Sequence, residues 1–458
     1  MNENKYGLDL TQGNIRTLLL RFAWPFLVSG LVSGLYGIID LLVVGQFTTP
    51  EIISGVSTGT QMMNLVYSAT IGIGTGGTVL IGRRMGERDP KACATAAGNF
   101  IMTSIALAVL LTGVVLAARE GLLTVLQTPE LARPSASRYV IYTTIGVPFL
   151  VGFNMMSALS RGMGNARAPS VIAAVGCAIN VVLDFVLVGV FPLKEVGAAI
   201  ATTIAQIASL AIMVIWQFRR KFPFPFARKD LRIEWPVVGN IFRVGLPLWI
   251  QELLVTVSFM IITGIVNAMG VVASASVGII SKVFNLGGIF PLSIGNAIAA
   301  MTAQNLGAGR RDRALKSLKW GIGYSLIIDA VLCLYCQIAP ETITALFTTD
   351  AAVITGAAAY LRSFSIDLLF VAFIFCANAY LSGCGKASVS MIHSLSATFA
   401  LRVPLSIFVA GLANLTVDTQ LYYLGFAAPI ASLLSIAIAF TYILRQQRRY
   451  KREEAGIV

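Results

Sequence analysis

The sequence predicts an all-α membrane protein whose twelve transmembrane helices form two pseudo-symmetric six-helix bundles, a parallel repeat around a V-shaped central cleft. Three observations lead to this prediction. Of the 458 residues, 56% are hydrophobic and only 12% are charged, whereas about a quarter of the residues in a soluble domain are charged. Apolar runs of about twenty residues, the length that spans a bilayer core, recur along the chain. Short landmarks also repeat at a constant spacing.

The spans are taken in order as apolar runs separated by charged segments. They are residues 20–46, 52–82, 92–118, 135–160, 167–191, 195–218, 238–267, 271–305, 314–338, 356–382, 387–411 and 420–444. Most of the 34 Lys and Arg residues then fall in loops on the side that holds both termini. The positive-inside rule therefore predicts a multi-pass protein of the plasma (inner) membrane with both termini in the cytoplasm. The net charge of +13 reflects this orientation and does not indicate nucleic-acid binding.

The chain contains an internal duplication. Three landmarks of the first half recur about 221 residues later: Arg21-Phe-Ala-Trp-Pro25 as Arg243-Val-Gly-Leu-Pro247, Met85-Gly86 as Leu306-Gly307, and Gly162-Met-Gly164 as Gly383-Cys-Gly385. Each half has an even number of spans, so both halves enter the membrane from the same side, as in a parallel repeat. We predict a bundle over residues 1–218, a basic, Pro-rich cytoplasmic linker over 219–236, and a second bundle with a basic tail over 237–458.

Several motifs that resemble catalytic or ligand sites have simpler interpretations. The glycine-rich stretch 71–77 follows no strand and lacks the Gly-Lys-Ser/Thr of a phosphate loop, so it indicates close helix packing or a bendable span. Cys333 and Cys336 lie inside a predicted span without a second pair, which favours packing. His393 is likewise interpreted as a packing residue rather than a proton relay. HExxH does not occur, and we expect no enzyme, no catalytic residues, no cofactor and no resident metal.

Five motifs in a fixed order resemble the multidrug and toxic compound extrusion (MATE) family, in its bacterial DinF-like and MepA-like branch. They are Trp24-Pro25, Asp40-x4-Gly45, Asn305-Leu-Gly-Ala-Gly309, Arg161-Gly-Met-Gly-Asn165 and Gly197-Ala-Ala-Ile-Ala-Thr202. The resemblance implies multidrug efflux: small amphipathic, mostly cationic compounds leave by alternating access while Na⁺ or H⁺ runs inward. The expected partners are these substrates and the lipid bilayer, with no nucleic acid, and we expect a monomer.

Four oxygen-bearing residues in the first half form the first candidate cation site. Asp40, Asp184 and Thr202 lie at one depth, roughly 10 Å below the outer surface at 1.5 Å per helical residue. Asn180 comes one helical turn before Asp184 and shares its face. Such oxygens suit a hard monovalent cation or a shared proton, and the resemblance places the cation site of archaeal and DinF-like members on these positions. The alternative is a buried hydrogen-bonded cluster that only ties spans 1, 5 and 6 together.

The second half contains another polar set, which consists of Glu252, Lys282, Asp367 and Arg402. In other branches of the family, acids in spans 7 and 10 are taken to bind the cation, and Glu252 and Asp367 resemble those. The set is therefore a second candidate site for cation or substrate. Alternatively, Lys282 and Arg402 neutralise the two acids as buried ion pairs.

Aromatic and methionine side chains in the spans are candidates for lining an adaptable substrate cavity: Tyr36, Phe153, Met156, Met260 and Phe284. The alternative for each is a lipid-facing or core position. A second function remains open, namely a flippase of the same superfamily for lipid-linked oligosaccharides or other lipids. For that function a wide, strongly cationic cavity is expected, whereas the Arg residues in the spans of the first half lie near the span ends and none lies in the membrane interior. A major-facilitator carrier is disfavoured because its Asp-Arg-x-Gly-Arg-Arg loop does not occur.

Overall fold

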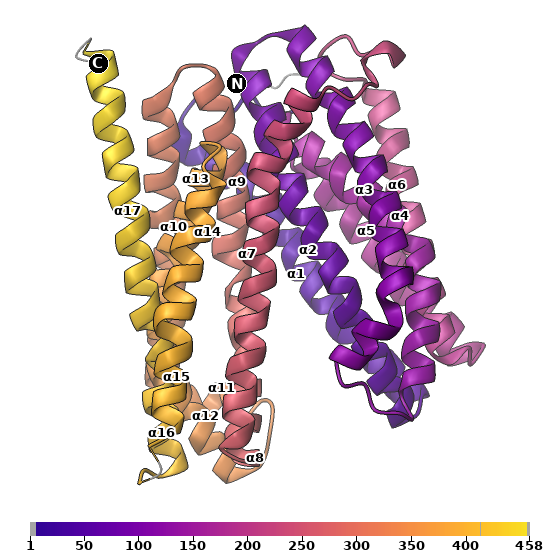
Figure 1. Ribbon diagram of the computed structural model, residues 1–458, viewed down its shortest axis with the longest axis vertical. Helices are drawn as coiled ribbons and strands as arrows, with labels where there is room; N and C mark the ends of the chain where they lie inside the picture. Colours follow the sequence, from indigo (N-terminus) through magenta and orange to yellow (C-terminus); the bar gives the residue numbers. More distant parts are fainter. Residues whose placement is uncertain (1–5, 413, 456–458) are drawn as a thin grey trace. The chain divides into compact units, whose positions relative to one another are not determined.

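The computed structural model describes residues 6–412 and 414–455, without the side chains of residues 36–38, 40 and 41. Over this part of the chain, twelve helical stretches are long and apolar enough to cross a membrane, so the predicted fold class is confirmed (Figure 1). In chain order the elements are α1 (Ile15–Phe47), α2 (Pro50–Glu87), α3 (Pro90–Val125), α4 (Arg133–Gly162), α5 (Arg167–Asp184), the π-helix η1 (Phe185–Val190), α6 (Lys194–Arg220), the 3-10 helix η2 (Arg228–Asp230), α7 (Trp235–Ala268), α8 (Val271–Gly287), α9 (Ile289–Gly307), α10 (Arg311–Ile338), α11 (Pro340–Thr344), α12 (Ala351–Phe364), α13 (Ile366–Gly383), α14 (Ala387–Ala397), the π-helix η3 (Thr398–Arg402), α15 (Val403–Ala410), α16 (Val417–Gly425) and α17 (Ala427–Glu454).

Side chains at the loop ends fix where several helices begin. The Asp89 carboxylate accepts hydrogen bonds from the backbone N–H groups of Lys91 and Ala92 at the start of α3. Asn14 caps α1 and Asp350 caps α12 in the same way. Because the first N–H groups of a helix have no partner within the helix, such caps stabilise its start, by about 1 kcal/mol each.

The chain divides into two compact units that cut across the sequence repeat. Unit 1 contains Met1–Trp249 and Ala303–Arg311, and unit 2 contains Ile250–Thr302 and Asp312–Val458. Helix α7 therefore contributes to both units, and the end of α9 packs within unit 1. The predicted domains rest on duplication in the sequence, whereas these units rest on packing, so the two divisions describe different properties of the chain.

The segment predicted as a linker packs on unit 1. Phe222, Phe224 and Phe226 lie against the core of this unit, and Phe222 stacks on Phe224 with ring centroids 5.3 Å apart. Further along, Gly98 of α3 lies so close to the linker that a Cβ atom there would come 1.8 Å from the carbonyl oxygen of Asp230. Proline prevents this segment from continuing helix α6, and its aromatic residues anchor it instead.

The duplicated loops have the same backbone conformation in both halves. Gly164 and Gly385 have φ of 88° and 74°, and the residue after each donates its N–H to the carbonyl five residues earlier, at 2.9 and 2.8 Å. Arg88 and Gly309 also match, with φ of 56° and 71° and N–H bonds to the carbonyl three residues earlier, at 3.2 and 3.1 Å. Glycine meets this left-handed geometry without strain. The repeat seen in the sequence is therefore also a repeat of loop structure.

The glycine-rich stretch 71–77 lies within α2 and permits close packing. A Cβ atom on Gly76 would come 2.3 Å from the carbonyl oxygen of Ile241, and one on Gly77 would come 2.1 Å from the ring of Phe100. Only a residue without a side chain fits there, as is common where transmembrane helices approach closely. The interpretation of this stretch as a packing surface, rather than a phosphate loop, is confirmed.

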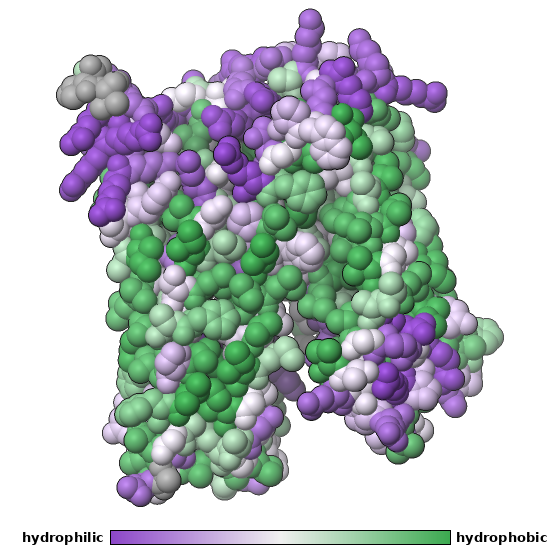
Figure 2. All heavy atoms as spheres, in the orientation of Figure 1, coloured by the Kyte–Doolittle hydropathy of each residue, from purple (hydrophilic) through white to green (hydrophobic). Residues whose placement is uncertain are grey.

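Some helices are interrupted where hydropathy predicts a single span. Gly288 separates α8 from α9, and Ser365 separates α12 from α13. The fifth span of each repeat contains a π-helical turn, η1 after α5 and η3 after α14. In Figure 2, hydrophobic residues cover the middle of the visible face of each unit, and hydrophilic residues gather at the end drawn uppermost.

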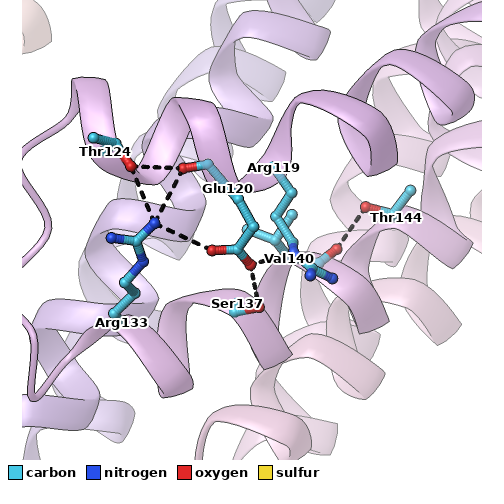
Figure 3. Close-up of polar contacts among 7 residues, drawn as sticks. All are labelled: Arg119, Glu120, Thr124, Arg133, Ser137, Val140 and Thr144. Carbon is cyan, nitrogen blue, oxygen red and sulfur yellow. Dashed lines mark hydrogen bonds and ion pairs between the residues drawn. The ribbon is translucent and has the colours of Figure 1, made fainter.

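A polar network holds α3 and α4 together where they are joined (Figure 3). Glu120 accepts hydrogen bonds from Arg119 at 3.0 Å and from Arg133 and Ser137 at 3.3 Å, while Arg133 also donates to Thr124 at 3.0 Å. These side chains are exposed or partly exposed, so water and salt screen the charges, and the network contributes little stability.

Candidate ion and substrate sites

Asp184 is a carboxylate held inside a membrane-spanning segment. It is the last residue of α5, its exposed fraction is 0%, and its Oδ2 accepts a hydrogen bond from Asn180 Nδ2 at 3.2 Å. Asn180 is itself only 3% exposed. The two residues are four apart on one helix, so the predicted shared face is present in the structure. Helix α5 packs against α1 and α6.

The backbone changes its winding directly after Asp184. Residues Phe185–Val190 form the π-helix η1, in which Phe191 N–H bonds to the carbonyl of Val186 at 3.0 Å. Single π-helical turns within α-helices occur frequently at functional sites. An acid in the membrane interior is costly and is a functional candidate by default. The Asp184 carboxylate, which accepts a hydrogen bond from the amide N–H of Asn180, can exchange a proton or hold a hard monovalent cation.

The other two residues of this predicted site are Thr202 and Asp40, and of these two the structure describes the side chain of Thr202 alone. The hydroxyl of Thr202 donates to the carbonyl of Ala198 at 3.0 Å, within its own helix α6. The backbone of Asp40 lies in α1, but its side chain lies outside the described part of the structure. The structure thus brings Asn180 and Asp184 together, and the cation-binding role of all four residues stays a prediction.

The second polar set is distributed through unit 2. Asp367 is buried, and its Oδ1 accepts a hydrogen bond from Ser432 at 2.5 Å, while Glu252 and Lys282 are exposed. The guanidinium carbon of Arg402 lies 4.5 Å from the ring centroid of Phe259, a cation–π contact. Among the described residues, no ion pair joins either acid of this set to either of its bases. A hydroxyl and an aromatic ring serve as the observed partners, and the role of the set in binding stays a prediction.

The residues predicted to line a substrate cavity have packing contacts where they are described. Phe284 lies 4.7 Å from Phe364 between ring centroids, at the core of unit 2, and Met156 packs against the core of unit 1. Phe153 is half-buried and Met260 is exposed, while the side chain of Tyr36 lies outside the described part. These contacts favour packing roles for Phe284 and Met156, and a cavity role stays a prediction for all five residues.

Unit 2 also contains buried polar groups that hydropathy does not indicate. His393 is fully buried and its Nδ1 lies 2.8 Å from Ser435 Oγ, in keeping with its interpretation as a packing residue. Asp329 on α10 is fully buried, and within the described residues neither of its carboxylate oxygens has a hydrogen-bond partner. A buried acid without a partner destabilises the fold in its charged form. Asp329 is therefore a third acidic position in the spans of unit 2, beside Glu252 and Asp367.

Sequence reasoning missed the N-terminal segment, which is an ordered part of unit 1. Leu8 N–H donates to the carbonyl of Gly164 at 3.0 Å, and Leu10 N–H donates to Gln304 Oε1 at 3.3 Å. Gln304 in turn donates to the carbonyl of Gly162 at 2.8 Å. The apolar alternation Tyr6, Leu8, Leu10 in an otherwise polar terminus is the signal that could have identified this segment as buried.

Tyr6 fastens that segment to the interior. Its hydroxyl donates to Gln217 and lies 3.2 Å from Ser160 Oγ. Burial raises the pKa of Tyr6 above its usual range, so the hydroxyl keeps its proton and remains a donor. The segment therefore connects the end of α6, the α4–α5 turn and the end of α9.

Two glycines of the repeated landmark meet in a close crossing of α2 and α9. A Cβ atom on Gly86 would come 2.0 Å from the carbonyl oxygen of Gln304, and one on Gly307 would come 2.0 Å from the carbonyl oxygen of Arg83. Each helix thus presents its glycine to the backbone of the other. Corresponding positions of the two sequence halves contact each other here, inside unit 1.

A family model matches the chain twice. The MatE model covers residues 25–186 and again residues 247–408. The second match begins and ends at the spacing that relates Pro25 to Pro247, which confirms the duplication.

Similar proteins extend over nearly the whole chain. The probable multidrug resistance protein YpnP of Bacillus subtilis (strain 168) is 23% identical over 436 residues, covering 95% of this chain and 96% of the relative. The multidrug export protein MepA of Staphylococcus aureus (strain N315) is 22% identical over 437 residues, covering 94% of each. The probable multidrug resistance protein NorM of Thermotoga maritima is 26% identical over 401 residues, covering 86% of this chain and 85% of the relative.

Solved structures have the same fold. One is described as the outward-facing conformation of a multidrug resistance MATE family transporter of the MOP superfamily, with a TM-score of 0.89, 20% identity, and coverage of 97% of this chain and 99% of that one. Another, a MOP superfamily transporter from Pyrococcus furiosus, also has a TM-score of 0.89 at 20% identity, with 98% and 99% coverage; its description states that reverse polarity of the binding pocket suggests a different function. The chain is therefore a multi-pass membrane protein with two repeats of six spans, and it belongs to the MatE family of transporters, the multidrug and toxic compound extrusion family.

Proposed function

We propose that this protein is a multidrug efflux antiporter that exports small amphipathic, mostly cationic compounds while Na⁺ or H⁺ runs inward. One observation carries the proposal: Asp184 is fully buried in a membrane span and bonded to Asn180 at 3.2 Å. A charged carboxylate there is costly, so binding of a cation or proton lowers the free energy of packing α5 against its neighbours α1 and α6.

The names of similar proteins support the export of many compounds, since YpnP and MepA are named as multidrug resistance and multidrug export proteins. The distribution of basic residues supports an orientation in the plasma (inner) membrane. Basic residues occupy the last turns of α2, α6 and α17, and an even number of spans places both termini on the same side. By the positive-inside rule that side is the cytoplasm.

We infer an alternating-access cycle in which occupancy of Asp184 selects between two packings. A cation enters from outside and neutralises the acid, α1 then repacks, and the substrate leaves. Pro25 lies inside α1 and removes one intrahelical hydrogen bond. Bending this helix at Pro25 therefore requires little free energy. Opening toward the cytoplasm then requires α2 and α9 to separate where Gly86 and Gly307 cross.

Reconstitution in liposomes tests this function. Purified protein is given a cationic amphipathic dye or an anionic dye of similar size, and a Na⁺ gradient and a pH gradient are imposed separately. We expect movement of the cationic dye, driven by one of the two gradients. Antiport is contradicted if the cationic dye moves at the same rate with and without each gradient. Movement of a lipid-linked oligosaccharide or another labelled lipid, with neither dye transported, favours the flippase function instead.

A further inference from the structure

A groove of about 1230 Å³ lies between α1, α5 and α6 in unit 1. Tyr6 and Trp216 contribute to its lining, with their rings edge to face and their centroids 5.4 Å apart. Tyr6 is held by its hydrogen bonds to Gln217 and Ser160. This part of the lining is therefore ordered by the same contacts that fasten the N-terminal segment.

The walls of the groove are apolar and open. Trp24 and Val28 of α1 are 64% and 40% exposed, and Val171 and Val175 of α5 are 55% and 42% exposed. All four lie in helices that span the membrane, so the medium that meets these walls is hydrocarbon rather than water. Tryptophan is enriched where hydrocarbon meets the headgroup region, which places Trp24 near that boundary.

Arginines lie at one end of the groove. Arg167 is the first residue of α5, Arg220 is the last residue of α6, and Arg21 lies in the second turn of α1. Because α6 runs antiparallel to α1 and α5, all three positions are at the same end of unit 1. Arg167 is at a helix N-terminus, where the helix dipole disfavours a positive charge.

The lining of the groove supplies no acid to balance the charges of Arg167 and Arg220. Among the described residues that line the groove there is no Asp or Glu. Neither Arg167 nor Arg220 forms an ion pair with a described acid. An apolar groove that ends in the guanidinium groups of Arg167 and Arg220 fits a molecule with a long hydrocarbon part and an anionic head.

We propose that this groove binds an anionic phospholipid from the leaflet on the basic side, with its phosphate at Arg167 and Arg220 and an acyl chain along Trp24, Val28, Val171 and Val175. Guanidinium groups bind phosphate with geometric specificity. The same positive rim repels the cationic compounds of the proposed export function. The groove is therefore a lipid site separate from the pathway of those compounds. This separation rests on the proposed export of cations, whereas the lipid binding itself is measured without transport.

Lipid binding to the full-length protein tests the proposal. The protein is purified in a mild non-ionic detergent and titrated with dioleoyl phosphatidylglycerol or, as the neutral comparison, dioleoyl phosphatidylcholine, and bound lipid is counted by native mass spectrometry. We expect one phosphatidylglycerol molecule to bind more tightly than phosphatidylcholine. A basic residue near an anionic lipid surface strengthens binding about five-fold, so the double variant Arg167→Gln/Arg220→Gln loses on the order of 25-fold in affinity.

A matched control separates the site from the general positive charge of the protein. The double variant Arg219→Gln/Arg228→Gln removes two exposed arginines of unit 1 that do not line the groove, and it retains the binding. Ala174→Trp fills the groove while leaving the arginines, and it lowers phosphatidylglycerol affinity. Equal losses in both arginine double variants, or no preference for phosphatidylglycerol, overturn the proposal. Displacement of the lipid by millimolar inorganic phosphate also overturns it, because the groove then recognises the anion alone.

Discussion

The close crossing of α2 and α9 predicts how substitutions at Gly86 and Gly307 change alternating access. In Gly86→Ala the new methyl group would come 2.0 Å from the carbonyl oxygen of Gln304, and in Gly307→Ala it would come 2.0 Å from that of Arg83. Real Cβ contacts essentially never fall below 3.0 Å, so the helices must separate by about 1 Å. Because the obstructing atoms belong to the backbone, no side-chain rotation relieves the contact. Overpacking of this kind costs about 1–3 kcal/mol.

That cost applies to the crossed arrangement and not to a state in which α2 and α9 have separated. A bias of about 1–3 kcal/mol changes the ratio of two states by roughly 5- to 150-fold. Hydrogen–deuterium exchange measured by mass spectrometry reports this ratio, because amide exchange tracks the population of the open form. Each variant is expected to exchange faster by such a factor in residues 83–88 and 304–310.

Gly113→Ala is the matched control, since a Cβ atom at Gly113 on α3 of the same unit meets nothing within 4 Å. It should leave both the exchange pattern and transport unchanged. The reasoning is refuted if Gly86→Ala and Gly307→Ala exchange like Gly113→Ala in the two crossing segments. It is also refuted if exchange rises uniformly over unit 1, because the substitutions then destabilise the whole unit rather than the crossing.

Three further substitutions test the packing described above. Tyr6→Phe leaves Gln217 without its buried hydrogen-bond partner, which costs about 1–3 kcal/mol, so faster trypsin cleavage near the N-terminus is expected, and wild-type cleavage kinetics would contradict the buried anchor. Gly98→Ala places a methyl group 1.8 Å from the carbonyl oxygen of Asp230; we expect linker residues 221–234 to become protease-sensitive, and unchanged digestion would show that the linker is not packed there. Asp329→Leu replaces a buried carboxyl group that lacks partners among the described residues with an apolar side chain. We expect the free energy of unfolding to rise by about 1–3 kcal/mol, and the protein therefore to unfold at a higher temperature. A lower unfolding temperature would instead indicate a stabilising partner of Asp329.

The spans and the repeat could be predicted from sequence because they depend on local composition and on self-similarity. The pair Asn180 and Asp184 followed from helical periodicity alone, and the hydrogen bond between them has the expected spacing of four residues. The turns at Gly164 and Gly385 were likewise marked by glycines in equivalent positions. These features are encoded within a few residues of where they occur.

Features that depend on distant contacts were not predictable. Residues 6–11 contain the apolar alternation Tyr6, Leu8 and Leu10, but the partners that order them, Gly164, Gln304 and Gln217, are far away in the sequence and could not be predicted. The π-helical turn after Asp184 adds one residue per turn without a hydropathy signal. Hydropathy identifies segments that enter the membrane, but not which polar groups meet inside it.

The central claim is that neutralisation of Asp184 by the coupling cation drives transport. It is tested most directly in liposomes containing Asp184→Asn, an isosteric variant that cannot carry the charge, beside the control Glu120→Gln, which removes an exposed acid of the same unit. Substrate binding at equilibrium and gradient-driven efflux are measured for both. The account predicts that Asp184→Asn still binds substrate but loses gradient-driven efflux, while Glu120→Gln keeps both. Full efflux with unchanged cation dependence in Asp184→Asn would contradict it.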